Sequence, residues 1–365
     1  MRRLAAALLV TLAAPAGAQE MPPDTVKALD ALIAAEMASG NLPSVAVSIQ
    51  AGGLGVYETA VGAANVGTGA ARLLGDPFRI GSVTKAALAT VVLQLAAEKK
   101  LALDAPVEAW FPGFPNAGRI TVEDLLRMQS GIVDPWDEAA LDAFYDDPLH
   151  PPGLDEMIAR AAARGADFAP PGEATVYANV NYLMLDRIVS AVEGRPTGEV
   201  LADRLFAPLA LSASEMPEGP ALRGALHGYG WNAGTKAFED RTELEPGPVG
   251  GAGAMVSSAA DLVVLVRAIC EGELLPPDLQ AARMEVAPLE GSPAFVGYGE
   301  GVARLGPFCG HNGTIMGFST EAWHWPERDA TIVVNVSRLD RDDHSQSSEL
   351  FLKIAKLLYP NDLPW

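Results

Sequence analysis

FRIGSVTK, at residues 78–85, contains a serine and a lysine three positions apart, and a long apolar segment follows it. Residues at i and i+3 are neighbours on a helix surface, so the amine of Lys85 can reach the hydroxyl of Ser82. A serine at a helix start also lies among unpaired backbone N–H groups, and the positive end of the helix dipole favours an oxyanion there. The spacing therefore predicts a nucleophile, Ser82, with Lys85 as its base.

Strand patterns lie on both sides of this motif, near the two ends of the chain. A helix is expected at residues 25–39, and the helices after the motif are expected at 82–99, 180–192, 197–205 and 348–358. The expected strands are 44–49, 56–61, 296–305, 308–310, 318–325 and 331–337. Consecutive strands at both ends predict an α+β fold: an antiparallel β-sheet flanked by helices, formed by both chain ends, with a helical lobe at about 82–211 inserted between them.

The first residues have the pattern of a secretory signal. Arg2 and Arg3 precede an apolar stretch at 4–14, and Ala-Gly-Ala at 16–18 provides a small-x-small cleavage site. We therefore expect a signal peptide at 1–18 and one mature domain at 19–365, with secretion into the periplasm as the simplest destination. No later stretch has the roughly 18 continuous apolar residues of a membrane span, so no span is expected.

The chain is strongly acidic. Its formal net charge is −20, and loss of the expected signal leaves 24 basic residues against 46 acidic ones. Such a surface repels phosphate backbones, so nucleic acid is not expected as a partner. A solvated acidic surface that aids solubility explains the charge itself.

Two cysteines, Cys270 and Cys309, are too few for a disulfide framework in a chain of 365 residues. An oxidising compartment would permit one bridge between them. Because Cys270 lies in a helical pattern and Cys309 in a strand pattern, we expect two buried free thiols.

Tyr177-Ala178-Asn179 lies in a loop just before the expected helix at 180–192. Tyr177 could carry a proton between nucleophile and leaving group, if nearby cations lowered a phenol pKa that is ordinarily about 10. Asn179 could hydrogen-bond both Lys85 and a substrate carbonyl. The alternative is a loop tyrosine with a capping asparagine.

His311-Asn312-Gly313-Thr314 follows the expected strand at 308–310. A strand that passes the serine can present a backbone N–H to a developing oxyanion, and a glycine lets substrate lie against the backbone. A single histidine is more often structural than catalytic, and each of the three motifs alone is weak evidence. Their combination supports a serine acyl-transfer site.

The order Ser-x-x-Lys, Tyr-x-Asn, His-x-Gly resembles the serine β-lactamase and penicillin-binding-protein superfamily, in particular class C β-lactamases and secreted D-alanyl-D-alanine carboxypeptidases. Similar flanking phrases are ITVEDLL at 120–126, APL at 207–209 and GGAG at 250–253, and the resemblance extends over about 25–358. It implies a sheet flanked by helices with the site between two lobes. It also implies that Ser82 is acylated and that Lys85 is its base.

The same resemblance implies further roles. Tyr177 would be the proton carrier, and the backbone N–H groups of Ser82 and Thr314 would bind the oxyanion. His311 stands where many members have lysine, so attraction of a substrate carboxylate should be weaker and more pH-dependent. The substrate-binding residues would be Asn179, His311, Asn312, Gly313 and Thr314.

Several activities fit these residues. The first expectation is a D-alanyl-D-alanine carboxypeptidase or a related D-amino-acid peptidase, and the alternatives are a carboxylesterase and a weak class C-like β-lactamase. The partner would be a small-molecule or peptide substrate, such as a peptidoglycan stem peptide or an acyl ester, with β-lactams as acylating ligands. The non-enzymatic alternative is a module that binds peptidoglycan fragments.

Other catalytic designs lack their motifs. No serine has glycines at both −2 and +2, as an α/β-hydrolase elbow requires. The five histidines are scattered without His-Glu-x-x-His, so neither a metal nor a cofactor is expected. Trp136, Trp323 and Trp325 are candidates to line the cleft, with aromatic core packing as the alternative.

Overall fold

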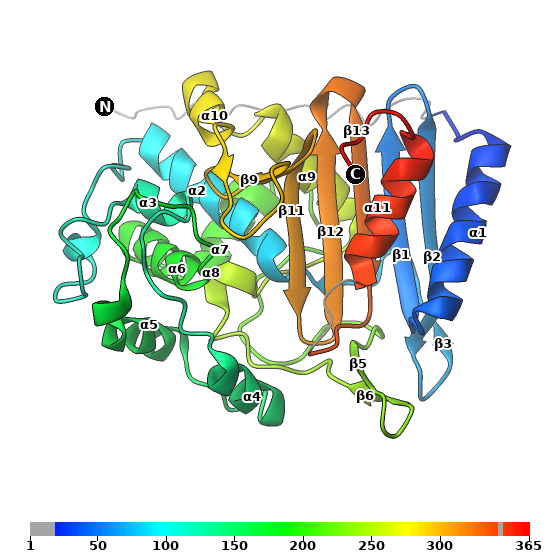
Figure 1. Ribbon diagram of the computed structural model, residues 1–365, viewed down its shortest axis with the longest axis horizontal. Helices are drawn as coiled ribbons and strands as arrows, with labels where there is room; N and C mark the ends of the chain where they lie inside the picture. The colour runs from blue at the N-terminus through cyan, green and yellow to red at the C-terminus, as the bar shows by residue number, and fades with distance from the viewer. Residues whose placement is uncertain (1–18, 342–345) are drawn as a thin grey trace, which may run out of the picture.

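One antiparallel sheet, built from both ends of the chain, dominates the computed structural model, which describes residues 19–341 and 346–365 (Figure 1). Strand β1, from the N-terminal part, pairs with β13, from the C-terminal part, in a register that joins Val45 to Val336. The strand order is β3 (Ala70–Ala71), β2 (Gly55–Asn65), β1 (Ser44–Ala51), β13 (Ala330–Val336), β12 (Phe318–Trp325), β11 (Phe308–Ile315), β10 (Ala303–Leu305), β9 (Val296–Tyr298) and β8 (Ala287–Pro288). The predicted α+β class is confirmed, and the predicted signal peptide at 1–18 lies outside the described residues.

Helices cover the central strands. Helix α11 (Gln346–Leu358) packs on β12 and β13 beside α1 (Pro23–Ser39), and α9 (Ala259–Glu271) packs on the same two strands. Every residue of β12 and β13 is buried. A strand buried on both faces is a near-continuous apolar run, which is why β13 reads Ala-Thr-Ile-Val-Val-Asn-Val without alternation.

The remaining helices gather on the side of the sheet away from α1 (left in Figure 1). They are α2 (Thr84–Ala97), α3 (Val122–Leu126), α4 (Glu138–Asp146), α5 (Leu154–Ala163), α6 (Val180–Glu193), α7 (Thr197–Leu201), the short α8 (Gly250–Gly253) and α10 (Pro277–Arg283). Helix α3 begins after its N-cap residue Thr121, whose hydroxyl accepts the N–H of Asp124 in a capping box. Two short pairs complete the described strands: β4 (Phe78–Arg79) with β7 (Val256–Ser257), and β5 (Tyr229–Asn232) with β6 (Ala237–Asp240).

Strand β11 is longer than predicted. It runs to Ile315 because β12 pairs with it from Cys309 to Ile315, so the histidine motif lies inside the strand instead of after it. Strand β10 pairs only with residues 308–310 of β11. The same edge of β11 is therefore not covered by β10 at residues 311–315, and there it faces the turn that contains Ser82. This edge positions the site.

Cys270 and Cys309 form a disulfide, so the expectation of two free thiols is wrong. The end of α9 lies against β11 and brings the two Cα atoms to 6.0 Å, although 39 residues separate them in sequence. That distance is ordinary for a bridge. The distance between the two cysteines is set by how α9 packs on the sheet. Neither the helical pattern around Cys270 nor the strand pattern around Cys309 carries that information.

No helix among residues 19–341 and 346–365 is long and apolar enough to cross a membrane. Two of the three tryptophans considered for the cleft belong to the core. Trp323 packs on Phe351 of α11, and Trp325 packs on Tyr359. For these two, the core-packing alternative is correct.

Candidate active site

Ser82 and Lys85 lie together as the spacing predicts. Ser82 belongs to a 3₁₀ turn, Gly81–Val83, and Lys85 lies in the first turn of α2. The Lys85 Nζ is 3.0 Å from the Ser82 Oγ and also contacts the Asn179 Oδ1 at 2.9 Å and the Ala252 carbonyl at 2.7 Å. These contacts fix the amine beside the serine.

Burial makes Lys85 a usable base. Its side chain is fully buried, and burial lowers its pKa to about 7, against the opposing effect of Asp134. At neutral pH a large share of the amine is therefore unprotonated and can accept the Ser82 proton.

Asp134 is a site residue that the sequence did not reveal. Its Oδ2 accepts the Asn179 backbone N–H at 2.7 Å and the Asn179 side-chain amide at 2.9 Å, which turns the Asn179 Oδ1 toward Lys85. Burial raises the pKa of Asp134, while backbone N–H groups of Asn179 and Trp136, the Lys85 charge and the Asn179 amide act to lower it. The one available signal was an acidic residue among the mainly apolar residues of 130–136, which has no periodicity.

The Tyr177 hydroxyl is buried beside Ser82 and has no hydrogen bond of good geometry among the described residues. Lys85 Nζ lies 4.8 Å from the centre of its ring. Burial dominates and raises the pKa of Tyr177, so the condition that cations lower this pKa is not met, and the residue is a neutral phenol at neutral pH. A buried hydroxyl that makes no well-formed hydrogen bond is ready to hydrogen-bond a substrate group.

Gly313 and Thr314 of β11 lie directly against the serine turn. A Cβ added at Gly313 would be 1.9 Å from the Ile80 carbonyl oxygen and 3.0 Å from the Ser82 nitrogen. A Cβ on Gly81 would meet the Thr314 backbone at 2.7–2.9 Å. The backbone nitrogens of Ser82 and Thr314 therefore lie where the serine turn contacts β11, as a two-donor oxyanion hole requires.

His311 is buried and neutral. Its Nδ1 donates to the Asn312 carbonyl at 2.5 Å, and its Nε2 lies 3.3 Å from the Tyr298 hydroxyl. Burial, followed by the charge of Lys85, lowers the pKa of His311 to about 3. An uncharged imidazole offers a carboxylate no ionic attraction. The exposed Asn312 adjoins His311 on β11 but does not line the cavity beside Ser82.

A cavity of 330 Å³ opens beside Ser82. Its charged lining residues within the described chain are Asp134 and Arg341, and Arg341 forms an ion pair with Asp142 of α4. Apolar and aromatic side chains form most of the remaining wall: Trp136, Leu141, Phe144, Tyr145, Val249, Ile315, Met316 and Leu339. Trp136 is thus the one tryptophan of the three that reaches the cleft.

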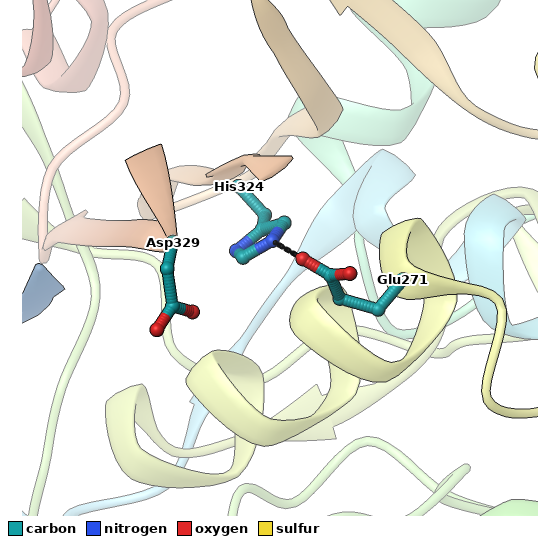
Figure 2. A group of neighbouring side chains, drawn as sticks. All are labelled: Glu271, His324 and Asp329. Carbon is teal, nitrogen blue, oxygen red and sulfur yellow. Dashed lines mark hydrogen bonds and ion pairs between the residues drawn. The ribbon is translucent and has the colours of Figure 1, made fainter. Parts of the chain in front are cut away.

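Glu271, His324 and Asp329 form a second group of polar side chains, none of which lines the cavity beside Ser82 (Figure 2). His324 is buried, with its Nε2 2.6 Å from Glu271 and its Nδ1 2.9 Å from the Thr331 hydroxyl, while Asp329 pairs with Arg267 at 2.9 Å. Both ring nitrogens and both carboxylates already have protein partners. We assign this group a structural role, joining the end of α9 to β12 and β13.

Comparison with known proteins gives a consistent result. A family model described as Beta-lactamase matches residues 29–354. Penicillin-binding protein 4 of Amycolatopsis lactamdurans is 31% identical over 304 residues, which cover 76% of each chain. A D-aminopeptidase of Brucella canis is 26% identical over 318 residues, or 86% of this chain, which spans 60% of that relative's length.

Among solved structures, the D-stereospecific amidohydrolase from Streptomyces sp. is similar at a TM-score of 0.78 and 28% identity, covering 92% of this chain and 98% of its own. The match thus includes both the sheet and the helices that surround the paired serine and lysine. The chain belongs to the Beta-lactamase family and is a serine hydrolase.

Proposed function

We propose that this enzyme hydrolyses the amide bond on the carboxyl side of a D-amino-acid residue whose α-amino group is free, as a D-amino-acid amidase or aminopeptidase does. The observation that carries the proposal is the carboxylate of Asp134 in the cavity beside Ser82. A carboxylate there attracts an α-ammonium group, and a charge-assisted hydrogen bond would hold it. The names of two relatives, a D-aminopeptidase and a D-stereospecific amidohydrolase, support this substrate class.

The site geometry supports an acyl-enzyme mechanism. Ser82 Oγ attacks the carbonyl carbon as its proton moves to Lys85 Nζ, and the N–H groups of Ser82 and Thr314 bind the oxyanion. Tyr177 then relays the proton to the leaving amine, breaking the C–N bond. Water attacks the ester on Ser82, which restores the serine and releases the D-amino acid.

A carboxypeptidase is less well supported, because it needs a cation for the carboxylate of its substrate. His311 is neutral, and Arg341 is paired with Asp142. Carboxylesterase and weak β-lactamase activities would use the same acyl-enzyme. Export is part of the proposal, and the Cys270–Cys309 disulfide supports it because such bridges persist in oxidising compartments.

Asp134→Asn tests the anchor for the α-ammonium group. In the wild-type enzyme, acetylating the amino group of a D-amino-acid amide should lower kcat/KM by about 100-fold, because the Asp134 carboxylate then loses the ammonium group that it would bind. The variant should shrink this preference about 10- to 100-fold. Steady-state kinetics on the two amides measure it, and p-nitrophenyl acetate, which has no amine, reports general damage to the site.

Asp155→Asn is the matched control, since Asp155 is an exposed carboxylate that pairs with Arg187 on the surface. It should keep the wild-type preference. A wild-type enzyme that favours N-acetyl-D-alanyl-D-alanine over free D-amino-acid amides would refute the proposal in favour of a carboxypeptidase.

The pH profile tests Lys85 as the base. Because its pKa is about 7, kcat/KM for a neutral ester should fall about tenfold for each pH unit below 7 and level off above about pH 8. Asp134 raises the pKa of Lys85, so Asp134→Asn should move this limb to lower pH. A limb that stays in place or moves to higher pH would contradict the assignment.

A further inference from the structure

The apolar wall of the cavity suggests which D-amino acid is accepted. Resting on the proposed function, we propose that this wall binds a bulky apolar side chain of the acyl group, so that D-phenylalanine-like and D-leucine-like residues are preferred over D-alanine. Helix α4 and the loop before it supply one side of the wall, and the β11–β12 turn supplies the other. The residues used in the argument are Trp136, Leu141, Phe144, Ile315 and Met316.

The position of the cavity places it on the acyl side of the scissile bond. The leaving amine takes its proton from Tyr177, whose ring packs against Tyr298 at 5.9 Å and His311 at 6.0 Å. Ser82 and Tyr177 line the cavity at the reacting centre, and from there it extends along β11 past Thr314 to Met316, whereas His311 does not line it. A group bound there belongs to the part of the substrate that stays on Ser82.

Asp134 and the apolar wall share this one cavity. An α-amino acyl group carries its ammonium and its side chain on the same carbon, one bond from the reacting carbonyl. A single cavity with one carboxylate and a large apolar surface can therefore bind both parts of such a group, the ammonium at the carboxylate and the side chain at the apolar surface. An alanine methyl would leave most of the 330 Å³ to water.

The wall is held in place before substrate arrives. Asp137 caps α4 by accepting the Ala140 N–H at 3.0 Å, and the Phe144 ring packs edge-on against Trp136 at 5.4 Å. Arg241 donates to the Tyr145 carbonyl at 2.9 Å. Leu141, which is 38% exposed, remains at the mouth as apolar surface that a bulky side chain would cover.

Paired substrates test the inference. We expect kcat/KM for D-phenylalanine amide to exceed that for D-alanine amide by about 10- to 100-fold. Leu141→Ala should reduce this ratio about 3- to 10-fold, since it removes contacts with the larger side chain. Leu149→Ala is the matched control: Leu149 is 41% exposed but does not line the cavity, so the ratio should stay at the wild-type value.

Equal or better use of D-alanine amide by the wild-type enzyme would overturn the inference while leaving the proposed function intact. If neither amide is cleaved but p-nitrophenyl acetate is, the proposed function fails, and the cavity is tested with esters instead. In that case p-nitrophenyl 3-phenylpropionate should be preferred over the acetate, with the preference reduced by Leu141→Ala. No preference among these esters would overturn the inference as well.

Discussion

Lys85→Met is expected to abolish acylation almost as completely as Ser82→Ala, with losses of about 10⁴- to 10⁶-fold in each case. The Lys85 amine is the basic group in contact with the Ser82 Oγ, at 3.0 Å, and its depressed pKa leaves it able to take a proton near pH 7. Methionine keeps the length and apolar stem of lysine without the amine. Acylation by p-nitrophenyl acetate, followed by mass spectrometry of the enzyme, measures the loss.

The double variant Ser82→Ala with Lys85→Met should lose no more than either single variant, because the two residues act as one unit. Lys353→Met is the control: this lysine pairs with Glu36 far from the cavity and should leave acylation unchanged. If Lys85→Met acylated at more than about a tenth of the wild-type rate, another group would be the base.

Gly313→Ala is expected to lower kcat by about 100- to 1,000-fold, the usual cost of losing an oxyanion donor. The added Cβ would lie 1.9 Å from the Ile80 carbonyl oxygen, far inside van der Waals contact, so β11 must move away from the serine turn. That movement withdraws the Thr314 N–H from the oxyanion. Turnover of a neutral ester and the thermal unfolding temperature together measure the effect.

Gly75→Ala is the matched control, because a Cβ there meets nothing within 4 Å. It should keep wild-type turnover. A Gly313→Ala enzyme with normal turnover and normal unfolding temperature would show that β11 does not lie in close contact with the serine turn at Gly313.

The sequence predicted most of the fold because its main elements carry strong local patterns. Strand β12 was expected and found at 318–325, and the helix before Gly194 was expected at 180–192 and found as Val180–Glu193. Helix α4 was missed, although Asp137 is an N-cap residue and apolar side chains recur at 140, 141, 144 and 145. Its short length and acidic composition hid the pattern.

The site was predictable where a motif holds its members close in sequence, as with Ser82 and Lys85. Asp134 could not be found this way, since its importance comes from the backbone N–H of Asn179, 45 residues away. The disulfide and the neutral state of His311 depend likewise on packing: one on α9 against β11, the other on burial between Tyr177 and Tyr298. The local sequence gives neither the distance between residues that are far apart in the chain nor the degree to which a side chain is buried.

The pairing of β1 with β13 also sets the order of events during synthesis. Val45 has its partner in Val336, so nearly the whole chain must leave the ribosome before the centre of the sheet can close. Contacts this distant make folding slow and keep apolar strands exposed for longer. The nascent protein would therefore depend on chaperones until its last strand is made, and removing the C-terminal strand would leave an aggregating chain instead of a smaller enzyme.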